Sequence, residues 1–151
     1  MNRIWIYQTK RPLNSRESEE ITQALDAFVI RWAAHKVKLD ARFLILYSHF
    51  IILSVNEEEV LASGCSIDDS VRFMQDLDMK YDLSLFNRMQ MGYIDANGEV
   101  QVCGFNDFDK LYESGIIKDN TLVFDNTITN SEQLSNSWKV PFAESGFVVL
   151  K

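Results

Sequence analysis

Two apolar runs separated by only two polar residues are the feature that most constrains the fold of this chain. The runs cover residues 43–47 and 50–55, and Ser48 and His49 divide them. Both runs are rich in β-branched and aromatic residues, which suit a pleated sheet, and short apolar runs between polar residues are typical of buried strands. The pattern predicts two strands joined by a tight hairpin.

A strand and a helix are predicted ahead of this hairpin. Residues 4–7, Ile-Trp-Ile-Tyr, suit a strand that packs on both faces. Asn14 with Glu17 three residues later gives the start of a helix, because the two side chains cap unpaired backbone N–H groups. An apolar stripe at helical spacing follows, formed by Ile21, Leu25, Phe28, Val29 and Trp32.

A second helix and a further strand are predicted after the hairpin. Ser66 and Asp69 resemble a capping pair, and Ile67, Val71, Met74 and Leu77 would share one helix face. A strand over residues 89–94 would complete a β-α-β-β-α-β order, which is the ferredoxin-like arrangement. The predicted class is therefore α+β.

The last third of the chain has a different pattern. Asn97-Gly98 between apolar stretches is a strong hairpin signal, and a short helix over 107–114 would end at Gly115. Strands are predicted over 121–124 and 147–150. We expect an N-terminal part over 1–90 and a C-terminal part over 91–151, packed as one compact unit because no Gly-, Ser- or Pro-rich linker separates them.

Composition and charge narrow the classes of function. The 151 residues carry a formal net charge of −7 with no basic run, which argues against nucleic-acid binding. No apolar stretch approaches the about 20 residues needed to cross a bilayer, and no signal peptide is evident at Met1. We therefore expect a cytoplasmic protein, with Cys65 and Cys103 as free thiols and no membrane contact.

Nucleotide hydrolysis is not expected. Residues 61–65 faintly resemble the signature loop of ABC-transporter ATPases, but the chain contains no G-x-x-x-x-G-K-[ST] loop. ATP hydrolysis requires backbone N–H groups and a lysine around the phosphates, with Mg²⁺ held by a carboxylate. No cofactor and no metal site is predicted, because Cys65, His35 and His49 have no short ligand spacing.

Cys65 is the candidate for covalent or redox chemistry. It lies at a predicted helix start, where the positive end of the helix favours the thiolate, and His49 is the candidate base. Asp68 and Asp69 oppose this effect through charge repulsion. The alternative is a small cysteine packed beneath the helix cap.

The sequence also resembles a family of small bacterial proteins of uncharacterised function. The similarity is carried by residues 64–73, by Trp32 and His35, and by the closing Trp-Lys-Val-Pro-Phe of residues 138–142. Members are sometimes labelled ABC-transporter ATPases. The resemblance implies no established activity.

Residues 93–138 resemble the bacterial type of GYF-like domain. The matching features are Asn97-Gly98, Phe105, residues 108–111, Gly115, Ile117, residues 121–124 and Trp138. Cys103-Gly104-Phe105 stands where the family has Gly-Pro-Phe, and the spacing along the sequence from Phe124 to Trp138 is long for this family. The resemblance implies a peptide-binding aromatic groove.

Three functions therefore remain open from the sequence, of which a structural or regulatory subunit is the third and is favoured only by the lack of a recognised chemical motif. The first is a non-enzymatic module that binds a protein or peptide partner, with Tyr93, Phe105, Tyr112 and Trp138 as ligand-binding candidates. The second is a cysteine-dependent or redox-responsive protein that uses Cys65. In the first case we expect Trp138 to cover the short helix at Phe108 and Leu111 and to keep one edge available to a ligand.

Overall fold

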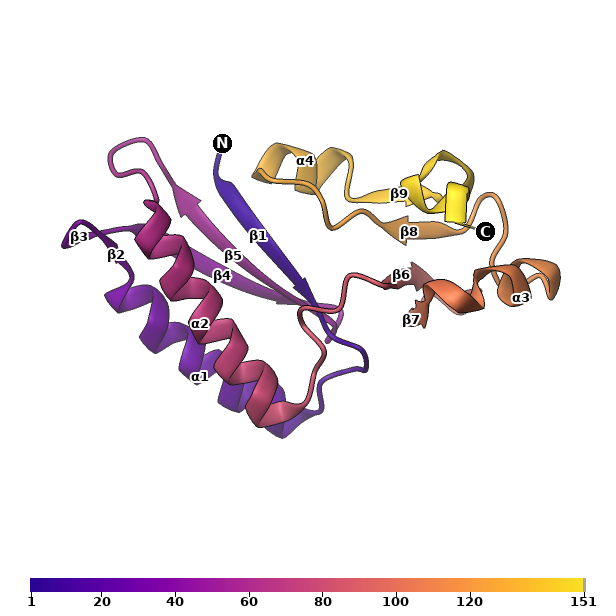
Figure 1. The fold of residues 1–151 in the computed structure, drawn as a ribbon, viewed down its shortest axis with the longest axis horizontal. Helices are drawn as coiled ribbons and strands as arrows, with labels where there is room; N and C mark the ends of the chain where they lie inside the picture. Colours follow the sequence, from indigo (N-terminus) through magenta and orange to yellow (C-terminus); the bar gives the residue numbers. More distant parts are fainter. Residues whose placement is uncertain (151) are drawn as a thin grey trace.

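The computed structural model describes residues 1–150 and contains two main antiparallel sheets flanked by helices (Figure 1). The α+β class is confirmed. The helices are α1 (Ser15–Arg31), α2 (Gly64–Tyr81), α3 (Phe108–Glu113) and α4 (Ser131–Asn136), with 3-10 turns η1 (Phe105–Asp107), η2 (Phe142–Glu144) and η3 (Gly146–Leu150). The strands are β1 (Arg3–Gln8), β2 (Ala33–Ala34), β3 (Val37–Lys38), β4 (Asp40–Leu46), β5 (Phe50–Asn56), β6 (Gln90–Ile94), β7 (Val100–Gly104), β8 (Leu122–Phe124) and β9 (Lys139–Pro141).

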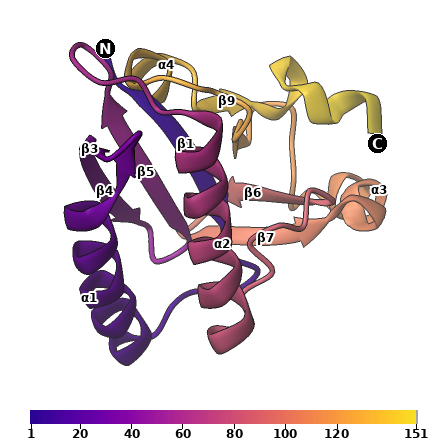
Figure 2. The same ribbon diagram turned by 60° about the vertical axis from the view of Figure 1, so that its left-hand side comes forward.

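The N-terminal sheet has the order β1-β5-β4, and both neighbours of β5 are antiparallel to it. The predicted hairpin is confirmed: β4 and β5 are joined at Tyr47 and Ser48, which both adopt positive φ angles (55° and 54°). Such angles are typical of the tight turns that match the twist of two strands. Helices α1 and α2 cover one face of this sheet (Figure 2).

Strand β1 packs on both of its faces, as its sequence predicts. Trp5 and Tyr7 face the helices, whereas Ile4 packs on the other side with residues of the C-terminal half. The alternation follows from the two-residue period of a strand. Its partner β5 is buried along most of its length on both faces, so it is the central element of the molecule.

The N-terminal cap of α1 agrees with the sequence prediction, whereas that of α2 does not. Asn14 caps α1, and the reciprocal bonds between Asn14 and Glu17 are both present, as predicted. The cap of α2 is Ser63 with Ser66 at the third position, so the predicted Ser66–Asp69 pair is wrong. The helix begins three residues earlier than predicted, because the hydroxyls of Ser63 and Ser66 each accept a hydrogen bond from the backbone N–H of the other residue.

The C-terminal sheet has the order β7-β6-β8-β9, and β6 belongs to it. This corrects the ferredoxin-like prediction, in which residues 89–94 would have joined the N-terminal sheet. Strand β6 pairs with β7 through the predicted hairpin at Asn97-Gly98, and its other edge pairs with β8 at Tyr93 and Val123. Both edges of β6 are thereby occupied within the second sheet.

Several short segments differ from the prediction or were not predicted, and α4 is one of those not predicted. Residues 147–150 were predicted as a strand but lie within η3, and β9 instead occupies the edge of the sheet next to β8. Strands β2 and β3 form a small hairpin that the sequence did not predict. Its turn, His35 and Lys36, has positive φ at two residues that rarely adopt it, so no standard turn signal marks it.

The two sheets pack face to face through a shared core (Figure 1). Ile4, Phe50 and Ile52 of the N-terminal sheet contact side chains from the C-terminal half. These are Val100, Phe124, Ile128 and Trp138, with Ile94 and Leu134 packed against them. The opposite face of the C-terminal sheet packs on α3 and the final turns. Over the described residues, no helix has the length and apolar character to traverse a membrane.

Candidate functional site

A pocket of about 550 Å³ lies where the end of β1 meets the C-terminal half, and we call it the interface pocket. Its volume falls within the about 300–1,000 Å³ range of ligand sites. Five segments contribute to it: the end of β1, the loop that leads from α2 into β6, the turn η1, the loop after β8, and the turn η3. The lining residues are Ile6, Gln8, Leu85, Phe86, Asn87, Arg88, Gln90, Phe105, Asp125, Asn126, Thr127 and Phe147.

Three phenylalanines line the interface pocket. Phe86 is 41% exposed and makes an edge contact with Tyr7, with ring centroids 5.6 Å apart. Phe105 and Phe147 are partly buried and contact each other edge-on at 5.8 Å. Aromatic side chains that retain accessible area around a concave surface are typical anchors for a ligand.

A chain of hydrogen bonds fixes the orientation of the amides at this pocket. The indole Nε1 of Trp138 donates to Asn126 Oδ1 at 2.9 Å, and Asn126 Nδ2 donates to Gln8 Oε1 at 3.0 Å. Because an indole N–H only donates, Asn126 must present its oxygen to Trp138 and its nitrogen to Gln8. Gln8 therefore accepts through Oε1, and its Nε2 remains as a donor.

The Nε2 atom of Gln8 makes no hydrogen bond with the residues that the structure describes. Since no fully buried side-chain N or O among these residues lacks a partner, this atom is accessible at the pocket. The close approach of Gln8 is possible because Gly92 of β6 has no side chain. A Cβ at Gly92 would lie 2.6 Å from Gln8 Oε1 and 3.2 Å from the Phe124 ring. Gly92 is thus a structural requirement of the pocket.

The outer edge of β1 borders the interface pocket. Ile4 N donates to Thr129 O at 2.9 Å, so the first part of this edge is covered by the segment before α4. Gln8 O accepts a long bond of 3.4 Å from Gln90 Nε2. In an antiparallel pair, every second residue points its backbone N–H and C=O away from the partner strand. Ile6 lies midway between Ile4 and Gln8, so its N–H and C=O also point away from β5, at the outer edge of β1.

Two charged residues line the pocket. Arg88 is exposed and forms no ion pair or hydrogen bond with any described residue. Asp125 is committed to a local turn, because its Oδ1 accepts from the Thr127 backbone N at 3.0 Å and from the Thr127 hydroxyl. Among the described residues, the Arg88 guanidinium therefore has no partner, whereas the Asp125 carboxylate already accepts two hydrogen bonds.

The four ligand-binding candidates from the sequence do not form one site. Trp138 is 3% exposed and packs against Phe50 and Phe124 at 4.9 and 4.8 Å, so it belongs to the core between the sheets. It does not cover α3, which corrects the expectation of an exposed edge over Phe108. Tyr93 is 6% exposed in the core beneath α3.

Phe105 is the candidate that lines the interface pocket. Tyr112 lies elsewhere, beside an open hollow with Ile117 and Lys118, and its hydroxyl donates to Asp119 Oδ1 at 2.7 Å. The sequence missed Phe86, Arg88 and Gln8. A large apolar residue inside the polar loop between a helix and a strand was the available signal for Phe86.

Cys65 and its candidate base His49 lie apart. Cys65 is exposed in the first turn of α2, which follows the end of β5. His49 is 5% exposed at the start of β5, where its Nδ1 lies 2.8 Å from Tyr47 O. The predicted Cys65–His49 pair is therefore wrong, since the two residues flank opposite ends of one strand. Burial, with a smaller contribution from Asp107, raises the pKa of Cys103 to about 12.

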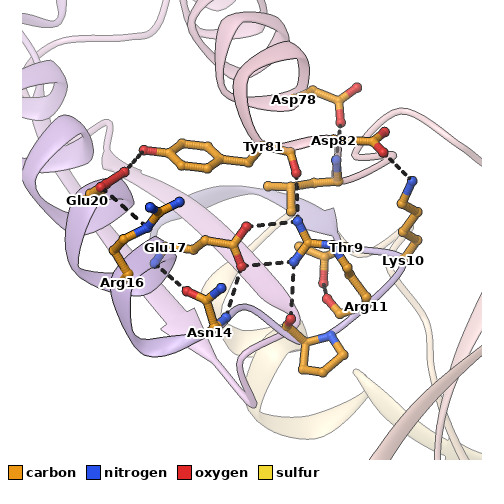
Figure 3. Close-up of polar contacts among 12 residues, drawn as sticks. Thr9, Lys10, Arg11, Asn14, Arg16, Glu17, Glu20, Asp78, Tyr81 and Asp82 are labelled. Atoms are coloured by element: carbon orange, nitrogen blue, oxygen red, sulfur yellow. Dashed lines mark hydrogen bonds and ion pairs between the residues drawn. The ribbon is translucent and has the colours of Figure 1, made fainter.

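The densest polar cluster joins the β1–α1 loop to the end of α2 and is structural (Figure 3). Arg11 donates to both Glu17 oxygens at 2.9 and 2.8 Å and to Tyr81 O at 2.7 Å. Tyr81 in turn donates its hydroxyl to Glu20 at 2.8 Å. Within residues 1–150 no three His, Cys, Asp or Glu side chains are grouped as metal ligands.

Comparisons with protein families, with curated proteins and with solved structures give no match to this chain.

Proposed function

We propose that this protein is a peptide-binding module and that the interface pocket is its binding site. The observation that carries the proposal is the placement of three phenylalanines, Phe86, Phe105 and Phe147, around one pocket beside the open part of an edge strand. An extended peptide can use both features, since its backbone can form hydrogen bonds with an open strand edge and its apolar side chains can pack into a pocket.

The binding mode follows from the edge of β1. A peptide strand beside Ile6 would receive one N–H and one C=O partner between the contacts at Ile4 and Gln8. One side chain of the peptide would then enter the aromatic part of the pocket near Phe86. Backbone bonds would supply affinity at this position, and the phenylalanines would select an apolar side chain.

The exposure of Phe86 supports a role in binding. A phenylalanine 41% exposed on a loop leaves apolar area in water, while most of the other aromatic side chains are buried in the three cores. Burying such a ring against a partner is favourable, and central aromatic anchors often contribute about 2 kcal/mol or more to binding.

Selection from a randomised peptide library with the full-length protein tests the proposal. Wild-type protein should enrich peptides with an apolar residue, and Phe86→Ala should weaken the best of them by about 2 kcal/mol. Met79→Ala is the matched control, because Met79 is 84% exposed on α2 and does not line the pocket. Failure of the wild type to enrich any peptide, or equal losses in both variants, would contradict the proposal.

A cysteine-dependent or redox-responsive function is the second candidate. Its support is the exposure of Cys65 within the first turn of an 18-residue helix. Alkylation rates of Cys65 measured against pH decide between the two functions. A thiol that titrates well below neutrality would favour the cysteine-dependent function, whereas titration near about 8.5 would leave peptide binding as the better proposal.

A further inference from the structure

Two donors at the interface pocket lack acceptors. Gln8 Nε2 is left over after Gln8 Oε1 has paired with Asn126, and the guanidinium of Arg88 has no partner among the described residues. Gln8 is more than nine-tenths buried as a residue, but its Nε2 atom stays accessible at the pocket, because no fully buried side-chain N or O among the described residues lacks a hydrogen-bond partner. Both groups are therefore suited to acceptor oxygens supplied by a ligand.

The chemistry of these donors identifies the ligand group. A guanidinium presents a planar fork of N–H donors that matches the two oxygens of a carboxylate. The amide nitrogen of Gln8 suits a carboxylate oxygen or a peptide carbonyl. Among the described residues that line the pocket, Asp125 is the only acidic one, and its carboxylate accepts hydrogen bonds from Thr127 and forms no ion pair with Arg88.

We infer that the interface pocket recognises the free C-terminal carboxylate of a peptide, with Arg88 as its charge partner. The inference rests on the proposed peptide-binding function. The whole chain carries a net charge of −7, so segments rich in Asp or Glu are repelled at long range. A peptide whose negative charge is confined to its terminus satisfies Arg88 without this repulsion. The terminal side chain is apolar, because phenylalanines line the pocket.

A matched pair of peptide pools tests the inference. Both contain randomised octapeptides attached through their N-termini, and they differ only in ending as a carboxylic acid or a carboxamide. The full-length protein should enrich the acid pool. The best acid peptide should bind about tenfold more tightly than its own carboxamide, as expected for the loss of one charge-assisted contact.

Substitution at Arg88 connects this preference to the pocket. Arg88→Gln should reduce the ratio of acid to carboxamide affinity to about one, since a charged partner is removed from an exposed position. Arg42→Gln is the control. Arg42 is equally an exposed arginine without an ion pair among the described residues, and it lies on β4 away from the pocket. It should leave the ratio unchanged.

The other possible outcomes show whether the terminal carboxylate alone, or peptide binding as a whole, is wrong. Equal binding of acid and carboxamide peptides would overturn the terminal carboxylate and leave peptide binding intact. Enrichment of carboxamides with an internal Asp or Glu would also overturn it, in favour of an acidic side chain. Binding of neither pool would overturn the proposed function together with the inference.

Discussion

Trp138 donates its indole N–H to Asn126 at 2.9 Å, and this bond connects the core between the two sheets to the interface pocket. Asn126 in turn donates a hydrogen bond from its Nδ2 to Oε1 of Gln8, the last residue of β1. The orientation of Gln8, and hence its unpaired donor, depends on a tryptophan that is itself inaccessible to a ligand. Trp138 therefore does not contact a ligand itself, but its hydrogen bond fixes the orientation of the Asn126 and Gln8 amides that line the pocket.

Replacing Trp138 should destabilise the whole protein. Trp138→Ala should lower the free energy of unfolding by about 3–5 kcal/mol, because it opens a cavity beside Phe50 and Phe124. Urea unfolding measures this loss. Leu122→Ala serves as the control, since Leu122 is 40% exposed on β8 and should cost less than about 1 kcal/mol. A loss for Trp138→Ala as small as the control would contradict the core assignment.

Gly92 should not tolerate a side chain. Gly92→Ala should destabilise the protein by about 1–3 kcal/mol, because the new methyl group meets Gln8 and Phe124 inside a packed interface. Gly104→Ala is the matched control at the end of β7, where the nearest atom to a Cβ is 3.6 Å away. Thermal unfolding of both variants gives the comparison. An equally stable Gly92→Ala would show that β6 and β1 are farther apart than described.

Stability should fall in acid through Glu17. Hydrogen bonds from Arg11, and then from the Asn14 backbone, lower the pKa of Glu17 from 4.5 to about 2. Since the folded state binds this proton less tightly than the unfolded state, the stabilisation is complete above about pH 5 and is lost as the pH falls towards 2.

The substitution Glu17→Gln isolates this contribution. The variant should be less stable than the wild type at pH 7, and its stability should change less between pH 5 and 2. Glu19→Gln is the control, because Glu19 is exposed on the same helix and has no ion pair among the described residues. Denaturation midpoints measured across this range would refute the assignment if the two variants had the same pH profile.

The two thiols should differ in reactivity. In the folded protein at pH 8, iodoacetamide should modify Cys65, which is exposed, and leave Cys103, which is buried and has its pKa raised to about 12. Mass spectrometry of the digested protein locates the label. After unfolding in urea both cysteines should react. Modification of Cys103 before unfolding would contradict its burial beneath α3.

Local patterns in the sequence predicted most elements, because caps, helical stripes and tight turns act over a few residues. Asn14 and Glu17 predicted the start of α1, and Asn97-Gly98 predicted the β6–β7 hairpin. The partner of β6 was mispredicted for the same reason. Strand pairing is decided by contacts between distant segments, and the mainly apolar residues 90–94 are compatible with a strand in either sheet.

The candidate site was predicted less well than the fold. Phe105 was identified through its aromatic character, but Trp138 has the same character and lies in the core. Residues of the interface pocket come from five segments that only tertiary packing brings together. The unpaired donor of Gln8 depends on contacts with Asn126 and Gly92, more than 80 residues away, which no local pattern contains.

Residue-resolved NMR of the ¹⁵N-labelled protein, titrated with the best peptide from the library, tests peptide binding at the interface pocket most directly. Peptide binding at this pocket should shift the signals of the Ile6 amide, the Gln8 side-chain amide and the loop around Arg88, and should leave the exposed faces of α1 and α2 unchanged. Shifts confined to other surfaces, or no shifts at peptide concentrations that saturate binding, would contradict it.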